Sequence, residues 1–169
     1  MALLWTYINQ QAIKAISENN QNQFDEIAEE TQVKDLQDLI GFEFYQDITQ
    51  NPDTTANAKL LDGGTWTSGG QTLIFKGLKY VLAYLFYCRY SFDTRNFDTF
   101  SGFARKNFDD AQPLSEGAIK NQALQYRKIG MKYWAECEQF LRDNAADYPY
   151  YHGNDSRGGC WDWDKINCI

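Results

Sequence analysis

Apolar residues recur every three to four positions through most of the chain, a spacing typical of amphipathic helices. Such stripes run over about residues 6–17, 24–40, 75–92 and 115–144. Gly41 ends or bends the second stripe, and a further helical piece follows it. Thr6 and Ser115 are suited to cap the first and last helices, because a hydroxyl oxygen can accept a hydrogen bond from a free backbone N–H. The pattern therefore predicts a mainly helical protein.

A different pattern interrupts the helices in the middle of the chain. Two β-prone runs, Thr65-Trp66-Thr67 and Gln71-Thr72-Leu73-Ile74, flank the turn Ser68-Gly69-Gly70. This arrangement predicts a small β-hairpin over about residues 62–75, preceded by a short element over 56–61. An isolated two-stranded hairpin is marginal in water. We therefore expect it to pack on the helices or on another subunit.

Two stretches lack any regular period. Residues 91–113 are predicted to form a long loop, interrupted by a short helix over about 102–107, and residues 148–169 an extended tail. The 169 residues fit one domain. The predicted fold is mainly α: a compact helical bundle of four to five helices, one small β-hairpin and an extended C-terminal tail, with the helical domain over 1–147.

Composition narrows the classes of partner. The chain has 16 Lys and Arg against 23 Asp and Glu, a net charge of −7. Affinity for nucleic acid comes mainly from basic side chains, so direct binding of DNA is disfavoured. Lys76, Lys79 and Arg89 interrupt the most apolar stretch, and the N-terminus has no signal-peptide pattern. We expect a soluble protein without a membrane partner, made in a cytoplasm.

Catalytic and metal chemistry find little support in the sequence. His152 is the single histidine, and it lies in the predicted tail, where a catalytic base would lack a fixed geometry. A metal site could be drawn from His152, Cys160, Cys168 and either Asp162 or Asp164, but the spacing matches no common zinc pattern. No phosphate-binding loop is present. We expect no catalytic residue, metal or cofactor, and free thiols at Cys88 and Cys137.

The tail leaves two alternatives open. Asp162 and Asp164 alternate with Trp161 and Trp163, and an extended strand would put the acids on one face and the rings on the other. A small carboxylate-dependent hydrolase would need such a pair of acids. A sugar-binding module would use the two rings. The same strip could also lie in the groove of a partner protein.

Aromatic residues are unusually frequent, at 16% of the chain. Many lie on the helical stripes, but several lie in the hairpin, the loop and the tail. Interfaces are enriched in aromatic side chains and arginine. The residues predicted to contact other protein chains are Trp66, Phe97, Phe100, Phe103, Arg105, Trp161 and Trp163.

Several short motifs follow one another in a distinctive order. They are Leu39-Ile40-Gly41-Phe42-Glu43-Phe44-Tyr45, Leu60-Leu61-Asp62-Gly63-Gly64-Thr65-Trp66, Phe75-Lys76-Gly77-Leu78-Lys79, Cys88-Arg89-Tyr90 and Thr99-Phe100-Ser101-Gly102-Phe103-Ala104-Arg105-Lys106. Over residues 3–150 this order resembles the head–tail connector (adaptor) proteins of tailed bacteriophages, especially of phages infecting Bacteroides-type hosts, including crAss-like phages.

The resemblance implies a structural virion protein without enzymatic activity. Such connectors form a ring, typically of twelve copies, in the neck between capsid and tail. The ring joins the portal protein to the next neck or tail component and extends the DNA channel. The implied partners are thus copies of the same chain, the portal and other neck or tail proteins, with DNA only as passing cargo. A net negative charge suits a channel through which DNA must slide.

Overall fold

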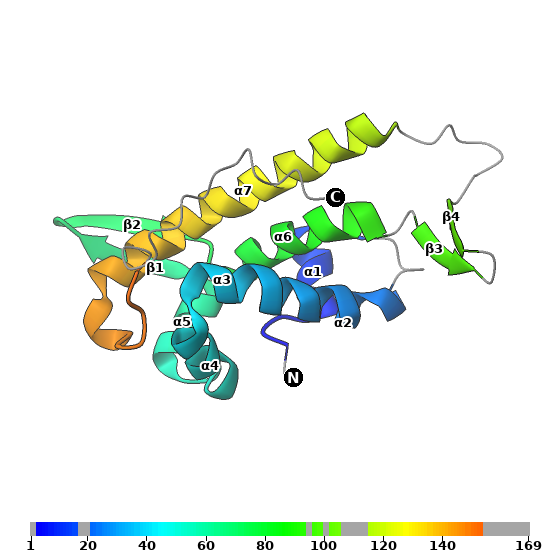
Figure 1. Cartoon of the computed structure of the whole chain (residues 1–169). Coiled ribbons are helices and arrows are strands. Elements are labelled where there is room, and N and C mark those ends of the chain that lie inside the picture. Colours follow the sequence, from blue (N-terminus) through cyan, green and yellow to red (C-terminus); the bar gives the residue numbers. More distant parts are fainter. Residues whose placement is uncertain (1–2, 17–20, 94–95, 100–101, 106–114, 154–169) are drawn as a thin grey trace.

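The computed structural model describes residues 3–16, 21–93, 96–99, 102–105 and 115–153. The helical elements are α1 (Tyr7–Ile13), α2 (Gln21–Glu30), the π-helix η2 (Thr31–Leu36), α3 (Gln37–Ile40), α4 (Phe42–Gln50), α5 (Thr55–Asp62), α6 (Leu78–Asp93), α7 (Glu116–Asp143) and the 3₁₀ turn η3 (Ala145–Asp147). The strands are β1 (Gly64–Ser68), β2 (Gln71–Phe75), β3 (Asn96–Thr99) and β4 (Gly102–Arg105). The mainly helical fold with a small hairpin is confirmed (Figure 1).

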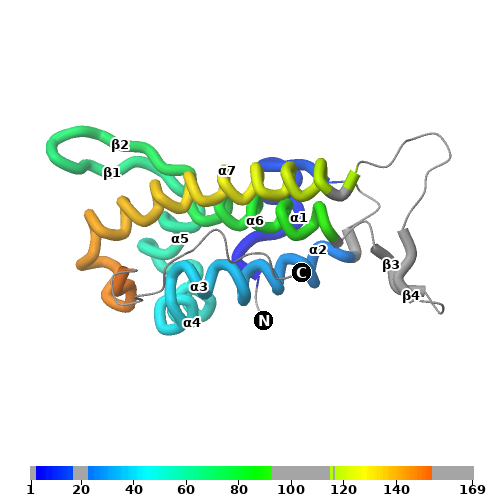
Figure 2. The backbone as a smooth tube through the Cα atoms, turned by 45° about the horizontal axis from the view of Figure 1, so that its top comes forward, coloured from blue at the N-terminus to red at the C-terminus, as the bar shows by residue number. Residues whose placement is uncertain are grey.

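Helix α6 lies at the centre of the packed body. It runs alongside α7 in both views (Figures 1 and 2), and α1, α2, η2 and α5 also pack on it. Leu78, Val81, Leu82, Leu85 and Phe86 are completely or almost completely buried. These residues repeat at three- and four-residue intervals, so one continuous apolar face of the helix forms the core.

The predicted helix caps are present. The Thr6 hydroxyl accepts a hydrogen bond from the Asn9 backbone N–H at 3.3 Å, and the Asn9 side chain accepts one from the Thr6 N–H at 2.9 Å. The Ser115 hydroxyl accepts one from the Ala118 N–H at 3.2 Å. Helix α1 ends at Ile13, earlier than predicted. The cap therefore fixes the start of this helix, whereas the apolar period overestimated its length.

The segment from α2 to α3 forms one helical rod with a π-helical middle. Gly41 ends it at a φ of +88°, a conformation that glycine adopts without a steric penalty. Three polar residues of the π-helix, Thr31, Gln32 and Asp35, are buried. Gln32 accepts a hydrogen bond from the Leu4 N–H at 2.8 Å and donates one to the Tyr45 hydroxyl at 3.2 Å. The rod thereby ties the N-terminal segment to the helices that follow it.

The base of the first hairpin is closed by two glycines. Gly63 and Gly77 both have a φ of +82°. A Cβ atom on Gly63 would come within 2.5 Å of the Lys76 carbonyl carbon, and one on Gly77 would clash with the Gly63 nitrogen. The chain thus enters and leaves the hairpin at nearly the same point. Two motifs that are distant in the sequence, Asp62-Gly63-Gly64 and Lys76-Gly77-Leu78, meet there.

Three predictions about the fold need correction. The structure has a second antiparallel hairpin, β3–β4, inside the segment predicted as a loop, and residues 102–105 form a strand rather than a helix. Helix α6 continues to Asp93, into the same segment. The predicted tail does not begin at 148, because Tyr148 is 3% exposed and belongs to the core. Residues 154–169 lie outside the described residues.

Candidate interaction surface

The hairpin β1–β2 has one face on the core and one face in solvent. Trp66 and Leu73 are paired across the strands, as are Gly64 and Phe75. Residues paired in this way point to the same side of a sheet, and successive residues along a strand point to opposite sides. Trp66 and Phe75 are buried. The residues that alternate with them along the two strands, Thr65, Thr67, Thr72 and Ile74, therefore make up the solvent face.

Trp66 anchors this hairpin to the C-terminal part of α7. Its ring lies 5.5 Å from that of Phe75 and 5.7 Å from that of Phe140, both in edge-to-face geometry, and the Phe75 and Phe140 rings stack at 4.2 Å. Only 8% of the Trp66 surface is exposed. The prediction that this ring contacts another chain is therefore wrong: its own chain buries it.

A polar contact completes the anchor. The Trp66 indole N–H donates a hydrogen bond to Asp143 Oδ2 at 2.8 Å. This hydrogen bond, together with one from Ser68, holds the pKa of the Asp143 carboxyl below its ordinary value. Since Asp143 is the last residue of α7, the contact fixes the hairpin relative to the end of that helix. The hairpin projects beyond the helices as an attached arm (Figures 1 and 2).

The solvent face of the hairpin is uncharged and rich in β-branched residues. Thr65, Thr67, Thr72 and Ile74 are all exposed, and Ile74 has 69% of its surface in solvent. We call these four residues the hairpin face. No charged residue occurs from Gly63 to Phe75, in a chain that is 23% charged. Natural sheets protect free edges with charged side chains, and this hairpin lacks that protection. The hairpin face is therefore the candidate interaction surface.

The other predicted interface residues are only partly described. Phe97, Phe103 and Arg105 lie on β3 and β4, where Phe97 pairs with Ala104 and Asp98 with Phe103 along the backbone. Phe100, Trp161 and Trp163 lie outside the described residues. So do Cys160, Asp162, Asp164 and Cys168. The structure therefore describes the side-chain contacts of one of the seven predicted interface residues, Trp66.

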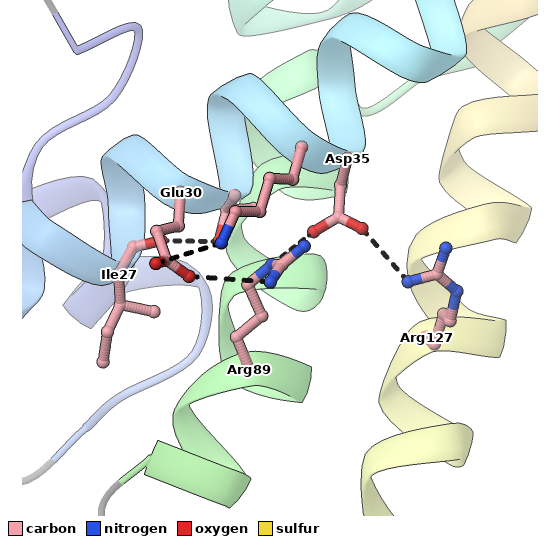
Figure 3. A network of polar contacts seen from close by, with 7 residues as sticks. Ile27, Glu30, Asp35, Arg89 and Arg127 are labelled. Carbon is pink, nitrogen blue, oxygen red and sulfur yellow. Dashed lines mark hydrogen bonds and ion pairs between the residues drawn. The ribbon is translucent and has the colours of Figure 1, made fainter. Parts of the chain in front are cut away.

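A cluster of charged residues joins the helical rod to the two long helices (Figure 3). The Asp35 carboxylate accepts a hydrogen bond from Arg89 Nε at 2.6 Å and one from Arg127 Nη1 at 3.1 Å. Glu30 lies 3.7 Å from Arg89. Asp35 is buried, so a pair of guanidinium groups on it offsets the cost of removing the charge from water. This ion cluster, Glu30, Asp35, Arg89 and Arg127, links η2 to α6 and α7.

The described residues that could take part in catalysis or bind a metal ion are either isolated at the surface or buried. His152 is largely exposed, and its Nε2 lies 3.6 Å from the Glu43 carboxylate. Cys88 and Cys137 are free thiols, as predicted, and burial raises the pKa of each. Within the described ranges, no group of three His, Cys, Asp or Glu side chains could hold a metal ion. None of the helices described there combines the length and apolar character needed to cross a bilayer.

The sequence reasoning missed the large apolar side chains that are exposed in the part of the chain that the structure describes. They are Ile8, Phe42, Ile74, Phe92 and Tyr150. For Ile74 the signal was available, because strand alternation places it opposite in direction to Leu73 and Phe75. The other four do not share such a local signal. Their exposure depends on which neighbouring elements cover them.

Comparison with known proteins identifies a family but no described relative. No curated protein and no solved structure matches the chain. Residues 36–160, well over half of the chain, match a family described as "Family of unknown function (DUF6712)". The match begins at the last residue of η2, so Asp35 and the packed segment before it precede the matched region. The chain therefore belongs to the DUF6712 family.

Proposed function

We propose that this protein is a structural, non-enzymatic component of a bacteriophage neck. In this proposal its copies form a ring, of about twelve by the resemblance to head–tail connectors. The ring joins the portal to the next neck or tail component in the virion and surrounds the DNA channel. The proposal rests on the motif order described above and on the exposed hairpin face. DNA passes through the ring without being bound, in keeping with the net charge of −7.

The hairpin face is the single observation that carries the proposal. The hairpin face is a rigid surface, because Trp66 on the opposite side of the hairpin packs against Phe140 and donates a hydrogen bond to Asp143. A surface that is held in place before binding loses little conformational entropy on association. Its β-branched side chains are of the kind that packs well on a pleated surface. A partner chain would bury Ile74, whose exposure is otherwise unfavourable.

The position of the hairpin also suits a closed ring. A cyclic assembly uses a heterologous contact, in which one surface of a subunit meets a different surface of its neighbour. The hairpin projects beyond the helices, so its solvent face is separate from the helical surfaces that a neighbour would offer (Figures 1 and 2). One arm and one receiving surface per subunit are the minimum such a ring requires.

The test is a charge on the hairpin face. Ile74→Lys places an ammonium group where the neighbouring chain would otherwise bury an apolar side chain, at little cost to the fold because Ile74 is already 69% exposed. We expect the purified variant to lose ring formation with the portal at least tenfold, measured by native mass spectrometry. Its thermal midpoint by circular dichroism should stay that of the unmodified chain.

Ile8→Lys is the matched control. Ile8 is 77% exposed and lies on α1, away from the hairpin. This variant introduces the same charge into an equally exposed isoleucine, and we expect ring formation to be unaffected. Unchanged assembly of Ile74→Lys, or no association of the unmodified chain with the portal at micromolar concentration, would contradict the proposal.

A further inference from the structure

Charges of opposite sign are concentrated on the helical rod and on α7. Residues 21–40, which form the rod, contain six acidic residues and one lysine. Residues 117–135, which make up most of α7, contain three lysines, one arginine and no acidic residue, although the whole chain has a net charge of −7. The protein therefore has one acidic and one basic helix surface.

The lysines of α7 lie on its solvent side. Lys120, Lys128 and Lys132 are all exposed, and we call them the lysine face. Within the described part of the chain none of the three forms an ion pair. Successive residues turn by about 100° around a helix, so Lys128 and Lys132 lie roughly opposite the buried residues Gly130 and Trp134. The lysine face thus points away from the body.

The helix itself does little to neutralise the lysine face. Lys128 and Lys132 are four residues apart, and like charges at this spacing repel each other on a helix. Glu136 follows Lys132 by one turn, but no described ion pair joins the two. The charge of Glu136 acts on Tyr133, whose pKa it helps to raise after the larger effects of burial and Tyr84. The positive charge of this face is therefore available to another molecule.

The first half of the rod shows the opposite charge in the same arrangement. Asp25, Glu26 and Glu29 are exposed, and we call them the acidic face. None of them forms an ion pair with a described residue, whereas Glu30 on the next turn is paired with Lys34. Asp25 and Glu29 are four residues apart, so they repel each other as the two lysines do.

The two faces lie on opposite sides of the body. Helix α6 lies between α7 and the rod in both views, and both pack on it (Figures 1 and 2). The rod turns Phe24, Ile27 and Ala28 toward the core, and α7 turns Trp134 and Cys137 toward it. The acidic face and the lysine face therefore point away from each other. They cannot neutralise each other within one chain, but they can do so between two chains.

We infer that the lysine face of each copy docks on the acidic face of the next copy in the ring. This inference rests on the proposed function, since it requires a second copy beside the first. Residues four apart on a helix have Cβ atoms about 5 to 6 Å apart, so Lys128 and Lys132 match the spacing of Asp25 and Glu29. The repulsion within each pair is then offset by attraction across the contact. Because the two faces are different surfaces of one subunit, the contact is heterologous, and its repetition around an axis closes a ring.

A second copy suits the two faces better than DNA does. DNA would attract the lysine face, but the acidic face and the net charge of −7 would oppose its approach. A neighbouring copy uses both faces at once and leaves neither without a partner of opposite charge.

The charged contact and the hairpin face would have different tasks in the ring. Complementary charges across an interface fix its orientation and suppress wrong pairings more than they add affinity. The hairpin face supplies an uncharged surface with the exposed side chain of Ile74. The charges therefore determine which side of one subunit meets which side of the next.

Two charge-reversed variants test the contact in the full chain. The first carries Lys128→Glu with Lys132→Glu, and the second carries Asp25→Lys with Glu29→Lys. In either variant alone both faces have the same sign, so we expect ring formation on the portal, measured by native mass spectrometry, to fall by about tenfold or more. In an equimolar mixture each altered face meets an altered face of opposite sign. We expect the mixture to restore the ring, with the two variants alternating in equal numbers when one of them is isotope-labelled.

Folding and net charge are controlled separately. All four altered side chains are exposed, so each variant should keep the thermal midpoint of the unmodified chain by circular dichroism. Mixing also cannot repair a variant that fails to fold. Asp53→Lys with Asp147→Lys changes the net charge as the second variant does, at two exposed positions outside both faces. We expect this control to form rings normally.

The outcomes separate this inference from the proposed function. Normal rings from either charge-reversed variant alone would overturn the inference and leave the ring intact. Loss of the ring in both variants without recovery on mixing would overturn it as well, because it would assign these charges to the portal, to DNA or to folding. Failure of the unmodified chain to assemble on the portal would count against the proposed function itself.

Discussion

The two long helices carry two very different stripes side by side. On the side that faces the helical rod, Arg89 and Arg127 share the buried carboxylate of Asp35 (Figure 3). On the adjacent side, a row of half-exposed tyrosines lies between Lys14 and Lys76, and we call this row the tyrosine ladder. It consists of Tyr80, Tyr84, Tyr87, Tyr126 and Tyr133. Charged groups usually face water and aromatic rings usually face the core. Here the charges hold the body together, and the rings are available for contact.

The contrast separates stability from recognition. Each oxygen of the Asp35 carboxylate already accepts from a guanidinium of its own chain, so little binding capacity is left for another molecule. The tyrosine ladder makes internal ring contacts, yet each of its rings keeps part of its surface in solvent. We therefore expect changes in the ion cluster to affect folding, and changes in the ladder to affect assembly.

The largest effect is expected from Asp35→Ala. Removing the carboxylate deprives the guanidinium groups of Arg89 and Arg127 of the negative charge that they share. The two arginine side chains are 27% and 22% exposed, so each group stays partly hydrated. We expect the free energy of unfolding to fall by about 2 to 3 kcal/mol, somewhat less than for a fully buried pair. Urea denaturation would measure it. Glu138→Ala, which breaks a surface pair with Arg142, is the control and should cost about 0.5 kcal/mol or less.

A smaller effect is expected from Tyr126→Leu. The variant loses the edge-to-face contact with Tyr87 at 4.6 Å and the contact with the Lys14 ammonium, but it keeps an apolar side chain on α7. We expect a loss of about 1 kcal/mol in the same urea measurement. A loss as large as that of Asp35→Ala would mean that the ladder is part of the folding core. The contrast between the two stripes would then fail.

The smallest effect is expected from alkaline pH. Burial raises the pKa of Tyr87, and the neighbouring Tyr126 adds to the shift. Because the folded state holds this proton more tightly than the unfolded state, the stabilisation is complete below the unfolded pKa of about 10 and is lost as pH rises beyond it. We expect the unfolding midpoint to decline above about pH 10, and Tyr87→Phe to flatten that decline. An identical decline in both proteins would contradict this account.

Local sequence patterns predicted the parts of the fold that depend on neighbouring residues. The caps at Thr6 and Ser115, the break at Gly41 and the hairpin over 62–75 each follow from a few adjacent side chains. The second hairpin was missed because its strands are four residues long and carry no clear apolar alternation. Such short strands are determined by their pairing rather than by their own composition.

The sites depend on pairs that are distant in the sequence. Asp35 meets Arg89 and Arg127 across 54 and 92 residues, and Trp66 meets Asp143 across 77. No local period encodes these contacts. The aromatic excess suggested that rings outside the helical stripes contact other chains, but it could not tell that Trp66 belongs to the core. That distinction requires knowing that the end of α7 lies beside the hairpin.

The close approach of Gly63 and Gly77 has a consequence for how this family can diversify. Because the two backbone segments lie against each other there, the hairpin leaves the helical body and returns to it at nearly the same point. Residues between Trp66 and Leu73, at the turn end of the hairpin, can be added or removed in pairs without altering the path of α5 or α6. We therefore expect homologous chains to differ in the length and composition of this arm while sharing the same helical body.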